Sequence, residues 1–351
     1  MDKERIKSFA DKVYGEMAGA MTMGMAFIGT SKGLFRAMSG KGAMTSEEVA
    51  SVTGLQSRYI EEWLRGMTAA GYLDYDANVE TFTLPDEHAF LLASEGTDHF
   101  MGGLFHFAPV LLGVAPKVAE AFEKGGGVKF QEFGPECITA IDMINSGQYA
   151  RRLGSYWLPQ MPDVVERLEK GGRVLDVGCG VGRVSTAIAK EFPSCVVVGL
   201  DPDIESISQA RLEAQSAGLG DQVEFVSSTT GQYQPEEGFD LVTAFDCLHD
   251  FSEPVKTLSE VRSLMKPDGT LFIVEPRAGD RLEENINSLG TVYYGFSIFH
   301  CMTQSLANGG PGLGTCMGPA RTEKLVREAG FTQFESLPIK SQTNMFYAAR
   351  R

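Results

Sequence analysis

Residues that build metal or redox centres are few in this 351-residue sequence. It has five histidines and six cysteines, no two cysteines form a CxxC pair, and no histidine lies close enough in the sequence to complete a zinc site. The sequence therefore predicts no metal centre. The cysteines are expected to be reduced thiols, as in a cytoplasmic protein.

Basic residues are also scarce. The chain has 31 Lys and Arg against 46 Asp and Glu, and its formal net charge is −15. Up to Lys170 there are 16 basic and 23 acidic residues, and the remainder has 15 and 23, so neither half is basic. Because nucleic-acid affinity rests largely on Lys and Arg that displace counterions from phosphates, no nucleic-acid partner is expected.

Long apolar runs are absent as well. The most apolar long segment, MGGLFHFAPVLLGVAP, is interrupted by His106, Pro109 and Pro116, and the first residues, MDKERIKSF, are mostly charged. We therefore expect no membrane partner and no signal peptide. The apolar segment is expected to form a buried helix or a pocket wall.

The first hundred residues have the pattern of a winged helix. A first segment, EMAGAMTMGMAFIG, suits a helix packed between domains or subunits, or a wall of methionines around a substrate. Thr45 or Ser46 then precedes a short helix, and a second helix follows from Ser57 with apolar residues at i, i+3, i+4 and i+7. Two strand-like pieces, YLDYD and TFTLP, complete the pattern.

A winged helix raises the possibility of DNA binding. Residues 1–100 hold nine Lys and Arg against fifteen Asp and Glu, and the second helix begins with the acidic stretch SRYIEEW. A packing or dimerisation role is therefore favoured over DNA binding, and a homodimer is expected. Residues 101–170 are expected to form a helical connection and pocket wall.

From Gly172 the sequence alternates between strands and helices. The runs RVLDVG, SCVVVGL, VEFVSS, FDLVTAF and GTLFIVE are short and nearly all apolar, as in strands covered on both faces. The helical stretches between them predict a doubly wound parallel sheet of the α/β class. FTQFESL and TNMFYAAR are expected to add a final antiparallel pair.

The first of these strands ends in a glycine-rich turn, VLDVGCGVG. Gly178, Gly180 and Gly182 leave room for backbone N–H groups to approach a ligand at the start of the next helix. A dinucleotide fingerprint requires a small residue where Arg183 stands, so a pyrophosphate ligand fits poorly. Asp201 ends the second strand, where a carboxylate is placed to accept hydrogen bonds from a ribose.

These motifs resemble the class I S-adenosylmethionine-dependent methyltransferases. The resemblance covers roughly residues 170–350 and includes VLDVGCGVG, FDLVTAFDCLHD and KPDGTLFIVEP. It implies a Rossmann-like doubly wound sheet that binds S-adenosylmethionine over residues 171–351, preceded by a mainly helical winged-helix domain over residues 1–100. The cofactor-binding residues it implies are Asp176, Gly178, Gly180, Gly182, Asp201, Ser228, Thr229 and Phe245.

The winged helix together with LHDF, IVEP and RTEKLVREAGF looks like the small-molecule O-methyltransferases. That resemblance implies His249 as general base and Glu275 as the acid that orients it, whereas Asp250 is expected to cap a helix or lie in a loop. A further acid of the family is missing, because Ala320 stands near its position. The expected substrate-binding residues are Tyr156, Trp157, Tyr293, Tyr294 and Asn344.

The function expected from the sequence is methyl transfer from S-adenosylmethionine to a hydroxyl of a small molecule. S-methylation of a small thioether acid, as in methyltransferases that form dimethylsulfoniopropionate, is the alternative, and it would need no base at His249. A regulator that binds DNA and senses the methyl donor remains a third possibility, and an idle cofactor-binding scaffold a fourth.

Overall fold

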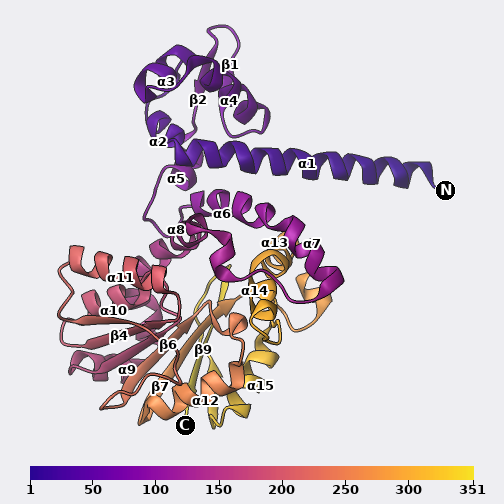
Figure 1. Cartoon of the computed structure of the whole chain (residues 1–351). Coiled ribbons are helices and arrows are strands. Elements are labelled where there is room, and N and C mark those ends of the chain that lie inside the picture. Colours follow the sequence, from indigo (N-terminus) through magenta and orange to yellow (C-terminus); the bar gives the residue numbers. More distant parts are fainter. The chain divides into compact units, whose positions relative to one another are not determined.

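The computed structural model describes residues 1–351 (Figure 1). Its contacts divide the chain into two units. Unit 1 comprises Met1–Val110 and Thr139–Gly147, and unit 2 comprises Leu111–Ile138 and Gln148–Arg351. The segment 101–170, which we expected to be one connection, thus contributes to both units. The expected boundaries at residues 100 and 170 stay predictions.

Unit 1 contains the helix, turn, helix and two-stranded wing. Thr45 caps helix α3 through a capping box with Glu48, and α4 buries its four apolar residues at i, i+3, i+4 and i+7. The elements are α1 (Lys3–Ser31), α2 (Leu34–Met38), α3 (Ser46–Thr53), α4 (Ser57–Ala69), β1 (Asp74–Asp76), β2 (Thr81–Thr83) and α5 (Asp86–Leu92).

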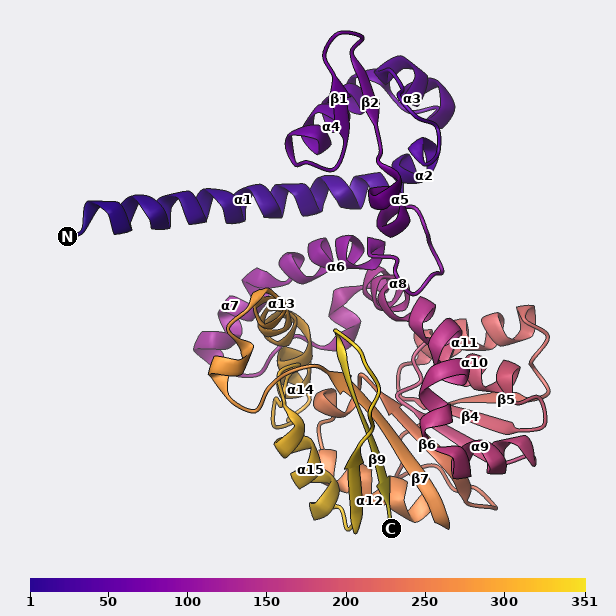
Figure 2. The ribbon, with the colours of Figure 1, turned by 180° about the vertical axis from the view of Figure 1, so that it is seen from behind.

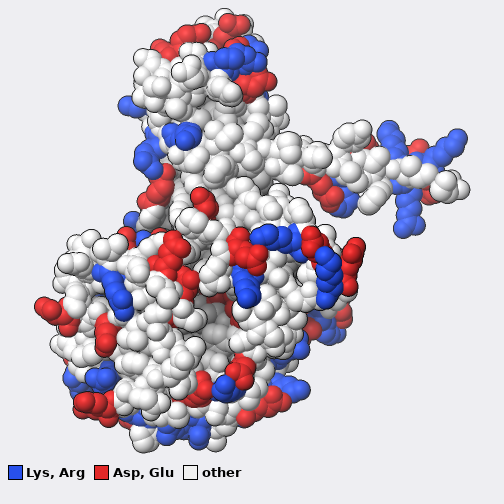
Figure 3. All heavy atoms as spheres, in the orientation of Figure 1, with Lys and Arg blue, Asp and Glu red and all other residues white.

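Helix α1 is exposed along most of its length. Residues 1–21 are all exposed in the single chain, and the helix carries a row of large apolar side chains, called here the α1 stripe: Ile6, Phe9, Val13, Met17 and Met21. Figure 3 shows charged side chains near the N-terminal end and near the middle of α1, with mostly uncharged surface between and beyond them. Within one chain, the expected burial of this helix is therefore limited to its last turns.

Several helices connect the winged helix to the sheet: α6 (Gly102–Gly113), α7 (Ala115–Lys124), α8 (Pro135–Arg152) and α9 (Pro162–Glu169), with the short turns η1 (Phe130–Phe133), η2 (Leu153–Trp157) and η3 (Leu158–Gln160). No single helix is long and apolar enough to cross a membrane. Only α6 and α7 taken together, bent by 48°, reach that length and composition.

Unit 2 is built on a seven-stranded sheet in the order β5-β4-β3-β6-β7-β9-β8. The five strands predicted from apolar runs are parallel, and the predicted C-terminal pair is antiparallel, with β9 beside β7. The strands are β3 (Arg173–Val177), β4 (Val196–Asp201), β5 (Val223–Ser227), β6 (Phe239–Phe245), β7 (Met265–Pro276), β8 (Gln333–Ser336) and β9 (Asn344–Arg350).

Helices cover both faces of this sheet (Figure 2). Alternate strand residues such as Val174 and Leu175 point to opposite faces, where they join two separate hydrophobic clusters. One face is covered by α9, α10 (Arg183–Glu191) and α11 (Ile204–Ser216), and the other by α12 (Pro254–Leu264) and α15 (Pro319–Glu328). The remaining elements are η4 (Leu248–Asp250), η5 (Leu282–Asn285), α13 (Ser288–Phe296), η6 (Ser297–Cys301) and α14 (Met302–Ala307).

Candidate active site

The carboxyl ends of the parallel strands bring most predicted site residues to one edge of the sheet. The glycine turn follows β3, Asp201 ends β4, His249 follows β6, and Glu275 lies one residue before the end of β7. Strand β9 runs antiparallel, so its first residue, Asn344, pairs with Pro276 at the same edge. In open α/β sheets, ligands bind at this edge.

The glycine turn has the backbone that its sequence predicts. Gly178, Gly180 and Gly182 all have positive φ, at 68°, 52° and 78°. A Cβ on Gly182 would lie 2.3 Å from the Phe225 ring, so the helix could not approach the sheet with another residue there, whereas a Cβ on Gly180 would meet nothing within 4 Å. The turn therefore packs tightly at one end and leaves open space at Gly180.

Asp201 and Asp176 support this turn in different ways. Asp201 accepts hydrogen bonds from the backbone N–H groups of Gly180, at 3.0 Å, and Asp203, at 2.8 Å. Asp176 is only 1% exposed and accepts from Ser185, through both its backbone and its hydroxyl, and from Thr243. Burial raises the pKa of Asp176 to about 6, although these bonds oppose the shift. Asp176 thus joins the first turn of α10 to β6 from inside the protein.

Ser228 and Thr229 form the turn that follows β5. The Ser228 backbone N–H donates to the Asp201 carbonyl at 3.2 Å, which places this turn beside the end of β4. Their hydroxyls donate within the turn, to the Thr229 carbonyl and to Gln232 Oε1. Their predicted contact with adenine stays a prediction.

His249 and Glu275 form a buried pair. Nδ1 of His249 lies 2.5 Å from Oε2 of Glu275, and the two side chains are only 3% and 4% exposed. The other oxygen of Glu275 accepts from the Leu248 backbone N–H at 3.0 Å, which fixes the carboxylate. The carboxylate thereby places the Nδ1 proton and leaves Nε2 as the ring nitrogen that can take up another proton.

Charge around His249 is predominantly negative. Burial disfavours the imidazolium, but the Glu275 and Asp250 carboxylates outweigh it and hold the pKa of His249 well above its usual value. Asp250 lies 3.6 Å from Nε2 and does not cap α12, whose N-cap position is Glu253. Burial raises the pKa of Asp250 to about 6, against the attraction of His249.

Asp246 is a site residue that the sequence did not single out. It follows β6 three residues before His249, and its carboxylate accepts from the Tyr149 hydroxyl at 2.8 Å and from the Asn344 amide at 2.9 Å. Asn344 thus lies at the edge, as predicted, but bonded to an acid that we had not named. The only sequence signal was a further carboxylate between FDLVTAF and LHD.

Trp157 and Phe245 lie in the hydrophobic core. Trp157 is 2% exposed and packs against Phe245, Phe346 and Tyr149. Phe245 is 6% exposed and packs in addition against Phe272. Their proposed contacts with substrate and cofactor stay predictions.

The other predicted substrate residues are not gathered in one place by direct contacts. Tyr293 is buried and donates to the Thr343 carbonyl at 2.7 Å, next to Asn344. Tyr294, on the next position of α13, is 37% exposed. Tyr156 is 36% exposed, and its hydroxyl accepts from the Lys340 backbone N–H.

One cysteine lies closer to a histidine than the sequence spacing indicated. A ring nitrogen of His249, a carboxylate oxygen of Asp250 and Sγ of Cys301 lie within 4.8 Å of one another, a spacing at which they could hold a metal ion. Thr315 donates to the same sulfur at 3.1 Å. The expectation that the chain uses no metal stays a prediction, and chelation tests it below.

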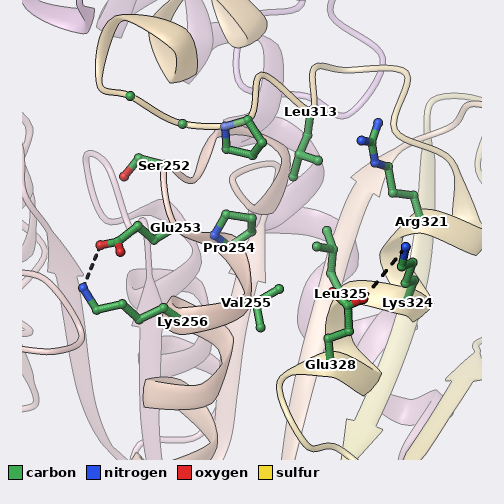
Figure 4. A pocket seen from close by; sticks show the side chains of 13 residues that line it. Ser252, Glu253, Pro254, Val255, Lys256, Leu313, Arg321, Lys324, Leu325 and Glu328 are labelled. Carbon is green, nitrogen blue, oxygen red and sulfur yellow. Dashed lines mark hydrogen bonds and ion pairs between the residues drawn. The ribbon is translucent and has the colours of Figure 1, made fainter.

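A separate pocket lies in unit 2, between the start of α12, a glycine-containing loop and α15 (Figure 4). Its volume is about 600 Å³, and it contains none of the predicted site residues. Ion pairs of Lys256 with Glu253 and of Lys324 with Glu328 lie on its walls. The edge of the sheet, not this pocket, therefore holds the candidate active site.

The strand order and the edge site together define the fold of the class I methyltransferases, joined here to a winged helix. Residues 168–330 match a family model described as a methyltransferase domain, and residues 19–94 match an Rv2258c-like winged HTH domain. The chain therefore combines a methyltransferase domain with an N-terminal winged-helix domain.

Known proteins with related sequences or folds include O-methyltransferases. The ubiquinone biosynthesis O-methyltransferase of Histophilus somni is 37% identical over 106 residues, which cover 28% of this chain and 43% of that protein. The chain spans less than half the length of the curated relatives it matches.

Solved structures of several methyltransferases align with the whole chain. A putative O-methyltransferase from Nostoc punctiforme has a TM-score of 0.73 at 16% identity, with both chains fully covered. Human N-acetylserotonin methyltransferase, in complex with S-adenosylmethionine, has a TM-score of 0.65 at 18% identity and covers 100% of this chain and 98% of its own. At these identities, the likeness establishes the fold.

Proposed function

We propose that this protein transfers a methyl group from S-adenosylmethionine to a hydroxyl group of a small molecule. The observation that carries the proposal is the buried His249–Glu275 pair, which lies at the carboxyl ends of β6 and β7, at the same edge as the glycine turn. The similarity to O-methyltransferases supports the same reaction type.

The residues at the edge fit a sulfonium-bearing donor. The turn has open space at Gly180, Asp201 stands at the end of β4 where a ribose would be held, and no Lys side chain bonds to the turn. A dinucleotide fingerprint has a small residue where Arg183 begins α10, and this edge carries several carboxylates. The negative charge of these carboxylates favours binding of the positively charged sulfonium of S-adenosylmethionine.

The role of the chain in the reaction follows from the His249 environment. S-adenosylmethionine supplies an electrophilic methyl group, and its transfer to a hydroxyl forms a C–O bond, breaks a C–S bond and leaves one proton to be removed. Nε2 of His249 accepts that proton, and the Glu275 carboxylate stabilises the resulting imidazolium at 2.5 Å. Proton removal of this kind contributes about 10²–10⁴-fold to the rate.

A screen with donor labelled in its methyl group tests the proposal. Matched sets of small hydroxyl, thioether and amine acceptors would be incubated with the protein, and labelled products would be separated. Labelled ethers are the expected products. Labelled sulfonium products would favour the S-methylation alternative and remove the base role from His249, and labelled amines would overturn the acceptor assignment.

We further propose that the protein is a cytoplasmic homodimer that pairs through the α1 stripe. Five large apolar side chains on the outer surface of one helix are between 47% and 66% exposed, and they are spaced at three to four residues. Such a row on a 29-residue helix would be covered by a second copy of the chain. Sedimentation of the full chain measures this directly, and a monomer at micromolar concentration would contradict it.

A further inference from the structure

Asp246 has a positive φ, which among non-glycine residues is most common for Asn and Asp. Its φ is +50°, in the left-handed region that non-glycine residues seldom adopt. Its N–H donates to the Val274 carbonyl at 2.8 Å, so neighbouring strand β7 holds the residue in this conformation. Strained residues of this kind persist only where the surrounding structure fixes them, and they cluster at functional sites.

The Asp246 side chain is held equally firmly. One carboxylate oxygen accepts from the Tyr149 hydroxyl and the other from the Asn344 amide, at 2.8 and 2.9 Å. Both donors are neutral: the Asn344 amide does not titrate, and burial and nearby carboxylates raise the pKa of Tyr149 well above its usual value. The carboxylate is therefore positioned by hydrogen bonds, and its charge is not neutralised by them.

The surroundings of Asp246 leave negative charge in excess. Burial raises its pKa to about 6, the neighbouring carboxylates of Glu275 and Asp250 add to the effect, and among charged groups His249 opposes it. A partly buried carboxylate among other carboxylates is costly unless a cation joins it. Asp246 forms no ion pair with Lys or Arg, so the protein itself supplies no such cation beyond His249.

Asp246 is close in sequence to a residue that contacts the glycine turn and to the base. The next residue, Cys247, touches the glycine turn: its Sγ is 3.3 Å from the Val177 carbonyl, and a Cβ on Gly178 would lie 3.0 Å from it. His249 follows two positions later. A sulfonium bound between the turn and the base has no N–H or O–H to donate, so charge is the main means by which a protein can recognise it.

We propose that the Asp246 carboxylate is the counter-charge for the sulfonium, and that it makes the site prefer S-adenosylmethionine over S-adenosylhomocysteine. The two ligands share the ribose, adenine and amino-acid groups, and they differ by one methyl group and one positive charge. The inference rests on the proposed function, because it assumes that S-adenosylmethionine is the donor.

Titration calorimetry with both ligands tests this on the full-length protein and on D246N. Asn is nearly isosteric, tolerates positive φ, and still bonds to Tyr149 and Asn344, because the Tyr149 hydroxyl also accepts. The expected result is a loss of about tenfold or more in affinity for S-adenosylmethionine, as removal of a close charge implies. Affinity for S-adenosylhomocysteine is expected to change less than about twofold.

D201N is the matched control. Asp201 is another carboxylate at the same edge, and it is expected to hold the ribose, which both ligands share, so its loss should weaken both to the same degree. Tyr149→Phe removes one hydrogen bond to Asp246 and keeps the charge, so it should keep most of the preference for the charged ligand. Circular dichroism confirms that each variant folds.

The outcomes separate the inference from the proposed function. If the unaltered protein binds neither ligand, the donor assignment fails. If it binds both, and D246N weakens both equally or neither, the donor assignment stands and the counter-charge role of Asp246 is refuted. If Tyr149→Phe loses the preference for S-adenosylmethionine over S-adenosylhomocysteine as fully as D246N does, the preference depends on the hydrogen-bond network around Asp246 and not on its charge.

Discussion

Replacing Glu275 with Gln removes the negative charge beside His249 without changing the size of the side chain. Glu275 accepts two hydrogen bonds, one from His249 Nδ1 and one from the Leu248 backbone N–H. A Gln amide has only one oxygen, so one of these buried donors loses its acceptor, at a cost of about 1–3 kcal/mol of stability. Without the carboxylate, the pKa of His249 falls, because that carboxylate is the foremost influence that raises it.

The change should be visible in the pH dependence of turnover. His249 must be neutral to accept a proton, so turnover rises as the pH passes through its raised pKa, above 6.5. In Glu275→Gln, the acidic limb of the profile is expected to shift to lower pH, and the alkaline plateau to fall because a base of lower pKa is weaker. In His249→Ala, which removes the base, the turnover rate at the alkaline plateau should fall by about 10²–10⁴-fold.

The assay is single-turnover methyl transfer between pH 5 and 10 with saturating donor. Glu283→Gln serves as a control, because it removes a charge from an exposed side chain in η5. An acidic limb that stays at the same pH in Glu275→Gln, beside an intact signal from circular dichroism, would refute the idea that this pair sets the protonation of the base.

The same pair links stability to pH. Folding raises the pKa of His249 above 6.5, so the folded state holds the proton more tightly than the unfolded chain does. The resulting stabilisation is fully present below pH 6.5 and is lost as the pH rises through the raised pKa. Urea denaturation at several pH values should show this loss in the parent protein and a smaller one in Glu275→Gln.

Three further predictions concern the turn, the helix and metals. Gly182→Ala should unfold at lower urea and bind S-adenosylhomocysteine more weakly, since its Cβ would lie 2.3 Å from Phe225; unchanged binding would contradict the tight packing. Ile6→Glu combined with Met17→Glu should convert a dimer to monomers in sedimentation without loss of helical signal, and a persistent dimer would place the interface elsewhere. Incubation with a chelator should leave methyl transfer unchanged, whereas a loss restored by zinc would assign an ion to His249, Asp250 and Cys301.

The fold was largely predictable because its elements are determined locally. Apolar runs of six or seven residues predicted the five parallel strands, although β7 extends further toward its N-terminus than its run, and Thr45 with Glu48 predicted the start of α3. The glycine turn was predictable too, since its residue types suit positive φ and close approach. The placement of His249 beside Glu275 was predicted from a family resemblance. No local sequence pattern indicates which acid on a neighbouring strand will contact a histidine.

The remaining features depend on contacts between distant residues. Tyr149 was part of an unremarkable helical stretch, and only the folded chain brings its hydroxyl to Asp246. Trp157 and Phe245 stand close to functional motifs, but an aromatic ring there suits the core as well as a ligand, and here both pack in the core. The nearness of Cys301 to His249 was hidden for the same reason, because spacing along the chain does not report distance in space.

The two donors that hold Asp246 come from opposite directions along the chain. Tyr149 precedes it by 97 positions and Asn344 follows it by 98. Both lie outside residues 168–330, the stretch that matches the methyltransferase-domain model. A chain shortened to that stretch would keep the glycine turn and the His249–Glu275 pair, yet neither donor would reach the aspartate. The arrangement at Asp246 is thus assembled only when α8 and β9 have both packed at the carboxyl end of β6, which ties this part of the site to the cooperative folding of unit 2.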